Sequence, residues 1–532
     1  MNTLELNERL SRISMTARRA VEARDWATVG LCAEEFQRLD PRAAEGHFLR
    51  GLSEKVQKRP LRAIEAFEKA LEADPRRYDA AVELANQYSI ARRNGDTAAL
   101  LEKYEDALSN SPLYLDLAGT IYTEIGMAQK AWPLYRKANE LQPGVDLFQA
   151  NLAACGVYLG KIEEAREIYL SLLQRFPTHR RNHYQLSRLQ KAGDTSHIDQ
   201  MKAILSGSDE PPERNIPLYF AIAKELEDLE QWDESFEYYR RAGDAVTRVA
   251  GYDVGKDIAL IDKVIEVCSA SWLAGGANDT QTDDSGKTPI FVVGLPRTGT
   301  TLTERIIASH SQVESLGETL FLQMVLRRES GVASVENMSP EMIEALAQKD
   351  MGAIAKGYID SVRYRLGDAP WFIEKLPFNF LYLGFIARAW PEARIVHLVR
   401  NPMDACFSMF KQPFTWAYKF SYDLDSLGQY YVAHDRLARH WQEVLGDRLI
   451  EVHYENLVTD QEAQTRGLLD RLGLDFEDAC LAFDRNQAPT ATASSVQVRE
   501  KVHSGSVHRW KRFERQLQPL RVQLENAGIS IE

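Results

Sequence analysis

The chain has 532 residues, of which 44% are hydrophobic and 27% charged, and its formal net charge is −13. This composition is typical of a folded protein and excludes collagen-like, low-complexity and disordered classes. The acidic balance argues against binding the phosphate backbone of a nucleic acid, although it leaves room for a local basic pocket that holds a small anion.

The N-terminal sequence and the cysteines predict the compartment. The sequence contains no run of 18 apolar residues, so it predicts no membrane span. The N-terminal stretch MNTLELNERLSRISM lacks the apolar core of a secretory signal. The five cysteines are widely spaced and contain no CxxC pair, which favours a reducing compartment over a disulfide framework or a zinc site. We therefore expect a cytoplasmic protein without a bound metal. The cysteines are Cys32, Cys155, Cys268, Cys406 and Cys480.

The first half of the chain repeats with a period of about 34 residues. Prolines mark this period, and small and aromatic residues stand at fixed offsets before them. The prolines are Pro41, Pro75, Pro112, Pro143 and Pro177, and the best-matched positions are Gly51, Ala63, Phe67, Gly119, Ala131 and Tyr135. The region resembles an array of about six tetratricopeptide repeats over residues 10–245. This resemblance implies an all-α solenoid whose concave groove binds a peptide or protein partner, or mediates a homodimer.

A polar segment separates the repeats from a second domain. Residues 274–287 are rich in Gly, Ser, Thr, Asn and Asp and show no apolar periodicity, which is typical of a linker. We therefore expect a multidomain chain. It would have a solenoid at 1–250, a connecting segment at 251–287 and a C-terminal domain at 288–532.

The C-terminal domain begins with a candidate phosphate loop. An apolar run at Pro289–Val293 predicts a strand, Gly294–Gly299 a loop, and the residues from Thr300 onward a helix. Strand, glycine-containing loop and helix together direct backbone N–H groups at a phosphate. The spacing of the glycines matches the loop of nucleoside triphosphatases, but Thr300 stands where that motif needs lysine, which disfavours a kinase.

The loop sequence GLPRTGTT resembles the 5′-phosphosulfate loop of sulfotransferases, which use 3′-phosphoadenosine 5′-phosphosulfate (PAPS) as donor. The resemblance implies an α/β domain with a central parallel sheet, and PAPS bound without a metal. It also implies donor contacts from Pro296, Arg297, Thr298, Gly299, Thr300 and Thr301.

Three further segments extend this resemblance. In ARIVHLVRNPMDACFSMF, Arg400 ends a predicted strand and Ser408 follows it, and sulfotransferases use this pair to hold the 3′-phosphate. Tyr454, in LIEVHYENLV, would lie near the nucleotide. SSVQVREKVHSGSVHRWKRF resembles the C-terminal cofactor loop of the tyrosylprotein sulfotransferase branch. The matching residues are Ser494, Ser495, Gln497, Val498, Arg509 (lysine in that branch) and Trp510.

Sulfuryl transfer to a hydroxyl needs a base for the acceptor proton and cations for the developing negative charge. Glu318 is the candidate base, and His310 and His397 are weaker rivals. The resemblance implies that Lys375 stabilises the bridging oxygen of the donor and that Arg297 holds the phosphosulfate oxygens. It implies that Ser494 assists Lys375 or contacts the bridging atoms.

One position departs from the tyrosylprotein branch. That branch has a second arginine four residues beyond the 3′-phosphate serine, where this chain has Gln412. The donor clamp would then be looser, or the neighbouring Lys411 would substitute for the arginine.

The leading hypothesis is a PAPS-dependent sulfotransferase whose acceptor is a tyrosine of a protein or peptide presented by the repeats. The alternatives are a sulfotransferase acting on a small-molecule or carbohydrate hydroxyl, and a non-catalytic scaffold that only binds nucleotide.

Overall fold

The computed structural model describes residues 3–275, 285–334, 336–414, 417–486, 488–490, 492, 494–499 and 501–531. Most of the linker expected at 274–287 therefore lies outside the described residues. The chain divides between Gly156 and Val157 into two compact units, each of which is described by itself.

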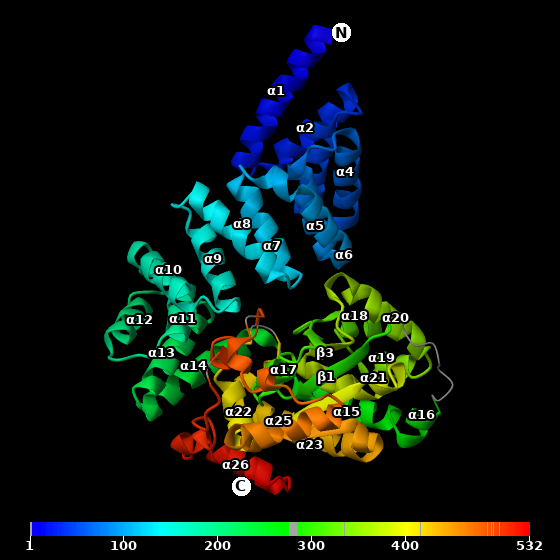
Figure 1. Ribbon diagram of the computed structural model, residues 1–532. Coiled ribbons are helices and arrows are strands. Elements are labelled where there is room, and N and C mark those ends of the chain that lie inside the picture. The colour runs from blue at the N-terminus through cyan, green and yellow to red at the C-terminus, as the bar shows by residue number, and fades with distance from the viewer. Residues whose placement is uncertain are drawn as a thin grey trace. The chain divides into compact units, whose positions relative to one another are not determined.

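Residues 3–250 form fourteen α-helices (Figure 1), which would make seven helix pairs rather than the expected six or so. The helices are α1 (Thr3–Glu22), α2 (Trp26–Leu39), α3 (Ala44–Val56), α4 (Pro60–Ala73), α5 (Tyr78–Ile90), α6 (Asn94–Tyr104), α7 (Pro112–Glu124), α8 (Ala128–Leu141), α9 (Asp146–Tyr158), α10 (Ile162–Arg175), α11 (Arg180–Leu189), α12 (Ser196–Ser206), α13 (Ile216–Asp228) and α14 (Trp232–Ala250).

The small residues of the repeat pattern lie where helices cross. A methyl group added at Gly119 in α7 would stand 2.9 Å from the ring of Tyr135 in α8, closer than packed atoms allow. Gly51 in α3 is in equally close contact with Phe67 in α4. These pairs explain the fixed offsets in the sequence, and the predicted all-α repeat region is confirmed.

The division into compact units falls inside the repeats, within α9. Helices α10–α14 belong to the same compact unit as the C-terminal residues, and aromatic side chains join α14 to them. Phe236 in α14 stacks on Phe410 with ring centres 5.7 Å apart, and it also contacts Phe513. The sequence placed the change of domain between residues 250 and 288, because the repeats end near 245 and a polar segment follows at 274–287. The limits 1–250 and 288–532 stay a prediction.

The remaining elements alternate between strands and helices (Figure 1). They are α15 (Val254–Val267), α16 (Ala270–Ala274), β1 (Thr288–Gly294), α17 (Thr300–Ile307), β2 (Val313–Ser315), α18 (Phe321–Ser330), α19 (Pro340–Leu346), α20 (Met351–Val362), β3 (Trp371–Lys375), α21 (Leu383–Ala389), β4 (Arg394–Val399), α22 (Pro402–Phe410), α23 (Leu424–Leu445), β5 (Leu449–His453), α24 (Tyr454–Thr459), α25 (Gln461–Leu472) and α26 (Gln518–Asn526).

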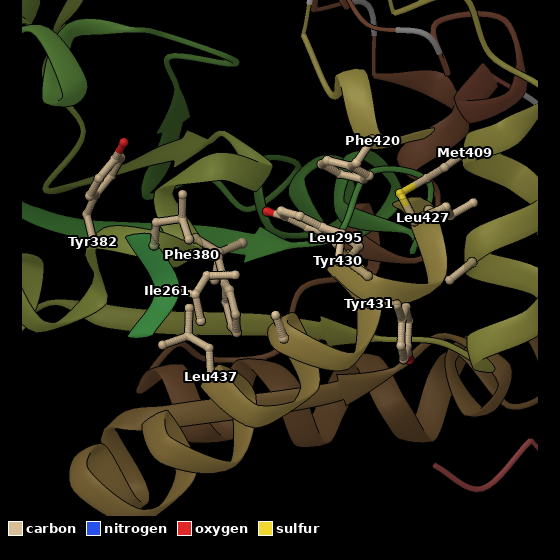
Figure 2. Close-up of a cluster of buried hydrophobic side chains, with 14 of the residues drawn as sticks. Ile261, Leu295, Phe380, Tyr382, Met409, Phe420, Leu427, Tyr430, Tyr431 and Leu437 are labelled. Atoms are coloured by element: carbon tan, nitrogen blue, oxygen red, sulfur yellow. The ribbon is translucent and has the colours of Figure 1, made fainter. Parts of the chain in front are cut away.

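The five strands form one parallel sheet in the order β2-β3-β1-β4-β5. In β1, Ile290 and Val292 face one apolar cluster while Phe291 and Val293 face another, so both faces of the sheet are buried. Figure 2 shows part of the second cluster, in which Phe420 stacks on Tyr430. The predicted fold class, a helical solenoid followed by an α/β domain with a central parallel sheet, is confirmed.

Three features bear on the expected compartment and on metals. Within the described part of the chain, no helix is both long and apolar enough to cross a membrane. The same residues contain no cluster of His, Cys, Asp and Glu side chains suited to a metal ion. All five cysteines are buried free thiols.

One buried carboxyl makes stability depend on pH. Glu374 in β3 is fully buried and accepts hydrogen bonds from Thr319 (2.9 Å) and Asn379 (3.0 Å). Burial raises the pKa of Glu374 to about 7, and the hydrogen bonds only partly oppose this rise. The folded state therefore keeps a proton on this side chain that the unfolded chain releases at lower pH.

Replacing Glu374 with glutamine is expected to raise the free energy of unfolding by about 3 kcal/mol at neutral pH. The folded pKa lies above the ordinary value of 4.5, so the stability from the protonated carboxyl is complete below about pH 4.5 and is lost as the pH rises through 7. Denaturant unfolding of both proteins at pH 5 and pH 8 checks this. A difference that does not change with pH would contradict it.

Candidate active site

The phosphate loop follows β1 and ends at the first residue of α17. Arg297 and Gly299 both have positive φ, 68° and 101°, so the chain bends sharply between strand and helix. The hydroxyl of Thr298 donates a 2.7 Å hydrogen bond to the carbonyl of Leu295 and closes the bend. The first N–H groups of α17 therefore follow directly on the loop that the sequence predicts to bind a phosphate.

Gly299→Ala is expected to weaken nucleotide binding and to lower the free energy of unfolding by about 1–2 kcal/mol. An added Cβ would meet the ring of Tyr454 at 2.6 Å, in a backbone region that L-residues rarely adopt. Gly331→Ala is the matched control, because Gly331 also has positive φ but its Cβ would meet open space. Calorimetric titration with adenosine 3′,5′-bisphosphate measures the first effect. Equal affinities for the two variants would contradict the prediction.

Arg297 reaches from the loop to the C-terminal cofactor segment. Its Nη1 donates to the Ser494 hydroxyl and its Nη2 donates a 2.6 Å hydrogen bond to Gln497, while its buried Nε has no partner among the described residues. Burial and the nearby Arg400 lower the pKa of Arg297 to about 10. An anion between these two guanidinium groups would relieve their repulsion.

Arg400 lies just beyond the carboxyl end of β4. Its Nη1 donates to the Arg297 carbonyl (2.8 Å) and to the Ser408 hydroxyl (3.4 Å), and its Nη2 donates to the Ser506 carbonyl (2.7 Å). The guanidinium also lies 4.6 Å from the ring centre of Tyr454, whose hydroxyl is 2.6 Å from that of Ser506. Arg400 and Ser408, predicted from one segment, therefore lie together with Tyr454, predicted from another.

Glu318 and Lys375 form an ion pair. Lys375 is the last residue of β3 and is fully buried, and its Nζ also lies 3.7 Å from Glu304 in α17. The side chain of Glu318 is 35% exposed. In this structure Lys375 contacts Glu318, so a role at the bridging oxygen of the donor requires the ammonium to turn from Glu318 toward the ligand.

The C-terminal segment 494–513, which the sequence predicts to contact the donor, is held in place by a buried carboxylate. Asp404 in α22 accepts hydrogen bonds from the backbone N–H groups of His508 (2.6 Å) and Trp510 (3.0 Å). These bonds fix the backbone on both sides of Arg509. The Nε atom of Arg509 lies 2.8 Å from Glu227 in α13, which is also 2.8 Å from Lys411 Nζ.

A cavity of about 600 Å³ opens over these groups. Its lining contains eight basic side chains and three acidic ones, a strong local excess in a chain whose formal charge is −13. This concentration favours a polyanionic ligand. The basic residues are Arg188, Lys191, Lys224, Arg297, Arg400, Lys411, Lys501 and Arg509, and the acidic residues are Glu227, Asp228 and Glu318.

Most of the predicted site residues line this cavity. They are Pro296, Arg297, Gly299, Thr300, Thr301, Glu318, Arg400, Ser408, Tyr454, Ser494 and Arg509. Thr298, Lys375 and Ser495 do not line it, and all three are buried beneath its surface.

The two rival bases lie away from the cavity lining. His397 is buried in β4 and stacks on Phe380. His310 is buried after α17, where its Nε2 is 2.9 Å from the Asp475 carbonyl. Of the three candidate bases, Glu318 is therefore the one that lines the cavity.

The sequence analysis missed the contribution of the repeat helices. Tyr184 and Arg188 in α11 and Glu227 in α13 also line the cavity. They are far from the phosphate loop in the sequence and carry no motif. Asp404 was missed as well, although its position in the first turn of a helix after Pro402 was a usable signal.

Residues 289–478 match the model of the sulfotransferase family. This segment resembles that family. The match begins at β1 and includes the phosphate loop, Glu318, Lys375, Arg400, Ser408 and Tyr454. The matched segment therefore supplies the phosphate loop and the strand-end residues of the cavity, while Ser494 and Arg509 lie beyond it.

Two kinds of relatives resemble the chain. An uncharacterized protein of Aquifex aeolicus (strain VF5) is 30% identical over 82% of this chain and 57% of its own length. The protein-tyrosine sulfotransferase of Drosophila melanogaster is 26% identical over 42% of this chain and 46% of its own length. Protein-tyrosine sulfotransferase 1 of Danio rerio is 26% identical over 42% and 65%. The chain thus covers less than two thirds of each relative.

Solved structures of two kinds resemble parts of the chain. The sulfotransferase domain of the Synechococcus PCC 7002 olefin synthase matches with a TM-score of 0.31 and 20% identity, over 44% of this chain and 90% of that domain. The tetratricopeptide-repeat protein YrrB matches with a TM-score of 0.28 and 15% identity, over 38% and 96%. The fold assignment rests on the elements described above.

Proposed function

We propose that the chain transfers a sulfuryl group from PAPS to a hydroxyl acceptor, and that this acceptor is a tyrosine of a protein or peptide. The observation that carries the proposal is the gathering of Arg297, Arg400, Ser408 and Glu318 around one basic cavity. The match of residues 289–478 to the sulfotransferase family model supports the reaction type, and the protein-tyrosine sulfotransferases among the relatives support the acceptor.

The cavity fits a nucleotide with two charged ends. The buried Nε atoms of Arg297 and Arg400 have no partner among the described residues, so both guanidinium groups keep donors for an anion. The loop with the first turn of α17 would hold the 5′-phosphosulfate. Arg400 and Ser408, with the ring of Tyr454 beside them, would hold the 3′-phosphate and the adjoining sugar.

In the proposed reaction Glu318 accepts the proton of the acceptor hydroxyl as the hydroxyl oxygen forms a bond to sulfur. The bond from sulfur to the bridging oxygen breaks at the same time, and its electron pair stays on the departing phosphate. Lys375 supplies positive charge for that oxygen, while Arg297 and the N–H groups of α17 stabilise the 5′-phosphate. No group of the chain is modified covalently, and the products are a sulfate ester and adenosine 3′,5′-bisphosphate.

The acceptor would enter beside the repeat helices. Tyr184, Phe220 and Tyr239 from α11, α13 and α14 line the cavity, which gives one wall an aromatic surface that suits a phenol ring. Recruitment of the acceptor through the repeat groove, a homodimer and the cytoplasmic location remain predictions from the sequence.

Incubation of the full chain with 35S-labelled PAPS and tyrosine-containing peptides tests the proposal directly. We expect label on the tyrosine and release of adenosine 3′,5′-bisphosphate. Transfer only to sugars or small alcohols would instead support the alternative acceptor class. Binding of PAPS without transfer to any hydroxyl would support the non-catalytic scaffold, and absence of binding would refute both readings.

A further inference from the structure

A carboxylate from the repeat helices lies among the cations of the candidate donor site. Glu227 stands in the last turn of α13, and its side chain is 4% exposed. Its Oε1 lies 2.8 Å from Lys411 Nζ and 2.8 Å from Arg509 Nε. Its Oε2 accepts a 2.9 Å hydrogen bond from the hydroxyl of Tyr239 in α14. Repeat helices and the C-terminal residues are thus joined by an ionic cluster centred on one buried carboxylate, with Arg509 at its exposed side.

The geometry of this cluster directs Arg509 toward the cavity. The backbone N–H groups of His508 and Trp510 are held by Asp404, and the Nε atom of Arg509 faces Glu227. Among the described residues, neither Nη atom of Arg509 forms a hydrogen bond, and Arg509 lines the cavity. The ion pair with Glu227 lies on the Nε side of the guanidinium, where Nε forms no hydrogen bond, so the two parallel Nη donors stay available for two oxygens of a phosphate.

Lys411 places its charge beside the same end of the site. It follows Ser408 by three residues at the end of α22, so both side chains lie on one face of the helix. Lys411 is partly buried close to Arg509 and Arg297, and without Glu227 these three cations would face one another unneutralised. Glu227 therefore lets Lys411 and Arg509 stay side by side next to Ser408 and Arg400.

We propose that Glu227 is a positioning residue of the donor site, which holds Lys411 and Arg509 in place to bind the 3′-phosphate of the nucleotide. This inference rests on the proposed function, since it takes PAPS as the donor. It also explains how a chain with Gln412 would hold that phosphate, because Lys411 and Arg509 together supply the charge. The repeats would then complete the nucleotide site besides meeting the acceptor.

Calorimetric titration of the full chain with two nucleotides tests this role. Adenosine 3′,5′-bisphosphate carries the 3′-phosphate, and adenosine 5′-phosphate lacks it. We expect Glu227→Gln to weaken binding of the bisphosphate about tenfold or more, the usual size for losing charged hydrogen bonds, and to leave binding of the monophosphate unchanged. Glu225→Gln is the matched control, because Glu225 is a buried carboxylate of the same helix whose partner is His197.

Two further variants separate positioning from folding. If Glu227 acts largely through Arg509, Glu227→Gln should weaken bisphosphate binding much less in the Arg509→Gln background than in the wild-type background. Glu227→Asp keeps the charge on a shorter side chain, so it should lose less bisphosphate affinity than Glu227→Gln and still bind the monophosphate as the wild type does. It replaces Glu227→Gln in the test if that variant does not fold.

The possible outcomes are distinct. Unchanged or tighter bisphosphate binding by Glu227→Gln would overturn the inference, since tighter binding means that the carboxylate competes with the ligand. A loss shared equally by both nucleotides would also overturn it. A wild-type chain that does not prefer the bisphosphate would instead overturn the proposed function.

Discussion

Glu318→Gln is expected to lower the rate constant of sulfuryl transfer by about 10²–10⁴-fold, the range typical for loss of a positioned general base. Glutamine has nearly the same shape, and it keeps a carbonyl oxygen facing Lys375, but it cannot take the proton of the acceptor hydroxyl. Glu318 is partly exposed, so the substitution should leave folding largely intact. Single-turnover kinetics with labelled PAPS at saturating acceptor measures the effect.

Glu314→Gln is the control for this variant. Glu314 in β2 is also part of a Glu–Lys pair, with Lys287 at 3.1 Å, but it does not line the cavity. We expect its transfer rate to stay close to that of the wild type. If Glu318→Gln also kept the wild-type rate, the proton would have to go to another group or to water.

Lys375→Met should cause the second large loss, with a fall of about 10²–10³-fold or more in the rate constant of transfer. Methionine fills a similar volume without charge, so the departing phosphate oxygen loses its nearest candidate ammonium group. The substitution also leaves Glu304 and Glu318 without their shared cation. Because breaking a buried ion pair commonly costs about 3–5 kcal/mol, the free energy of unfolding should fall as well.

Loss of stability and loss of chemistry can be separated for this variant. Lys287→Met removes a lysine from a comparable pair outside the cavity lining, with side-chain exposure of 13%. Both variants are assayed below their unfolding temperatures, and their bisphosphate affinities are measured in parallel. A transfer rate for Lys375→Met equal to that of Lys287→Met would contradict a catalytic role for Lys375.

Local motifs predicted the phosphate loop and its neighbours well. Glycine spacing, a strand before the loop and a helix after it are short-range signals, and parallel strands bring their carboxyl ends to one edge. For this reason Arg400 and Tyr454, which follow β4 and β5, both meet the loop although they are 54 positions apart in the sequence. The repeat pattern was equally readable, because helix crossings such as Gly119 against Tyr135 require small residues.

The remaining features depend on long-range packing, which no single sequence displays. Nothing near Glu227 indicates that it will meet Lys411, 184 residues further along the chain. Likewise, the burial of Ser495 and Thr298 beneath the cavity wall depends on how the C-terminal segment packs on the loop. A motif can name residue types for a ligand, but it cannot show which of them face the ligand and which support the backbone.

The contacts of Phe236 with Phe410 and Phe513 determine where the protein can be cut. A fragment cut at the polar segment before β1 would leave those two rings, together with the cations around Glu227, open to water. Such a fragment should aggregate and be poorly soluble even though it contains the whole segment that matches the sulfotransferase family model. The shortest fragment that keeps these contacts covered therefore starts near Val157, where the chain divides into its two compact units.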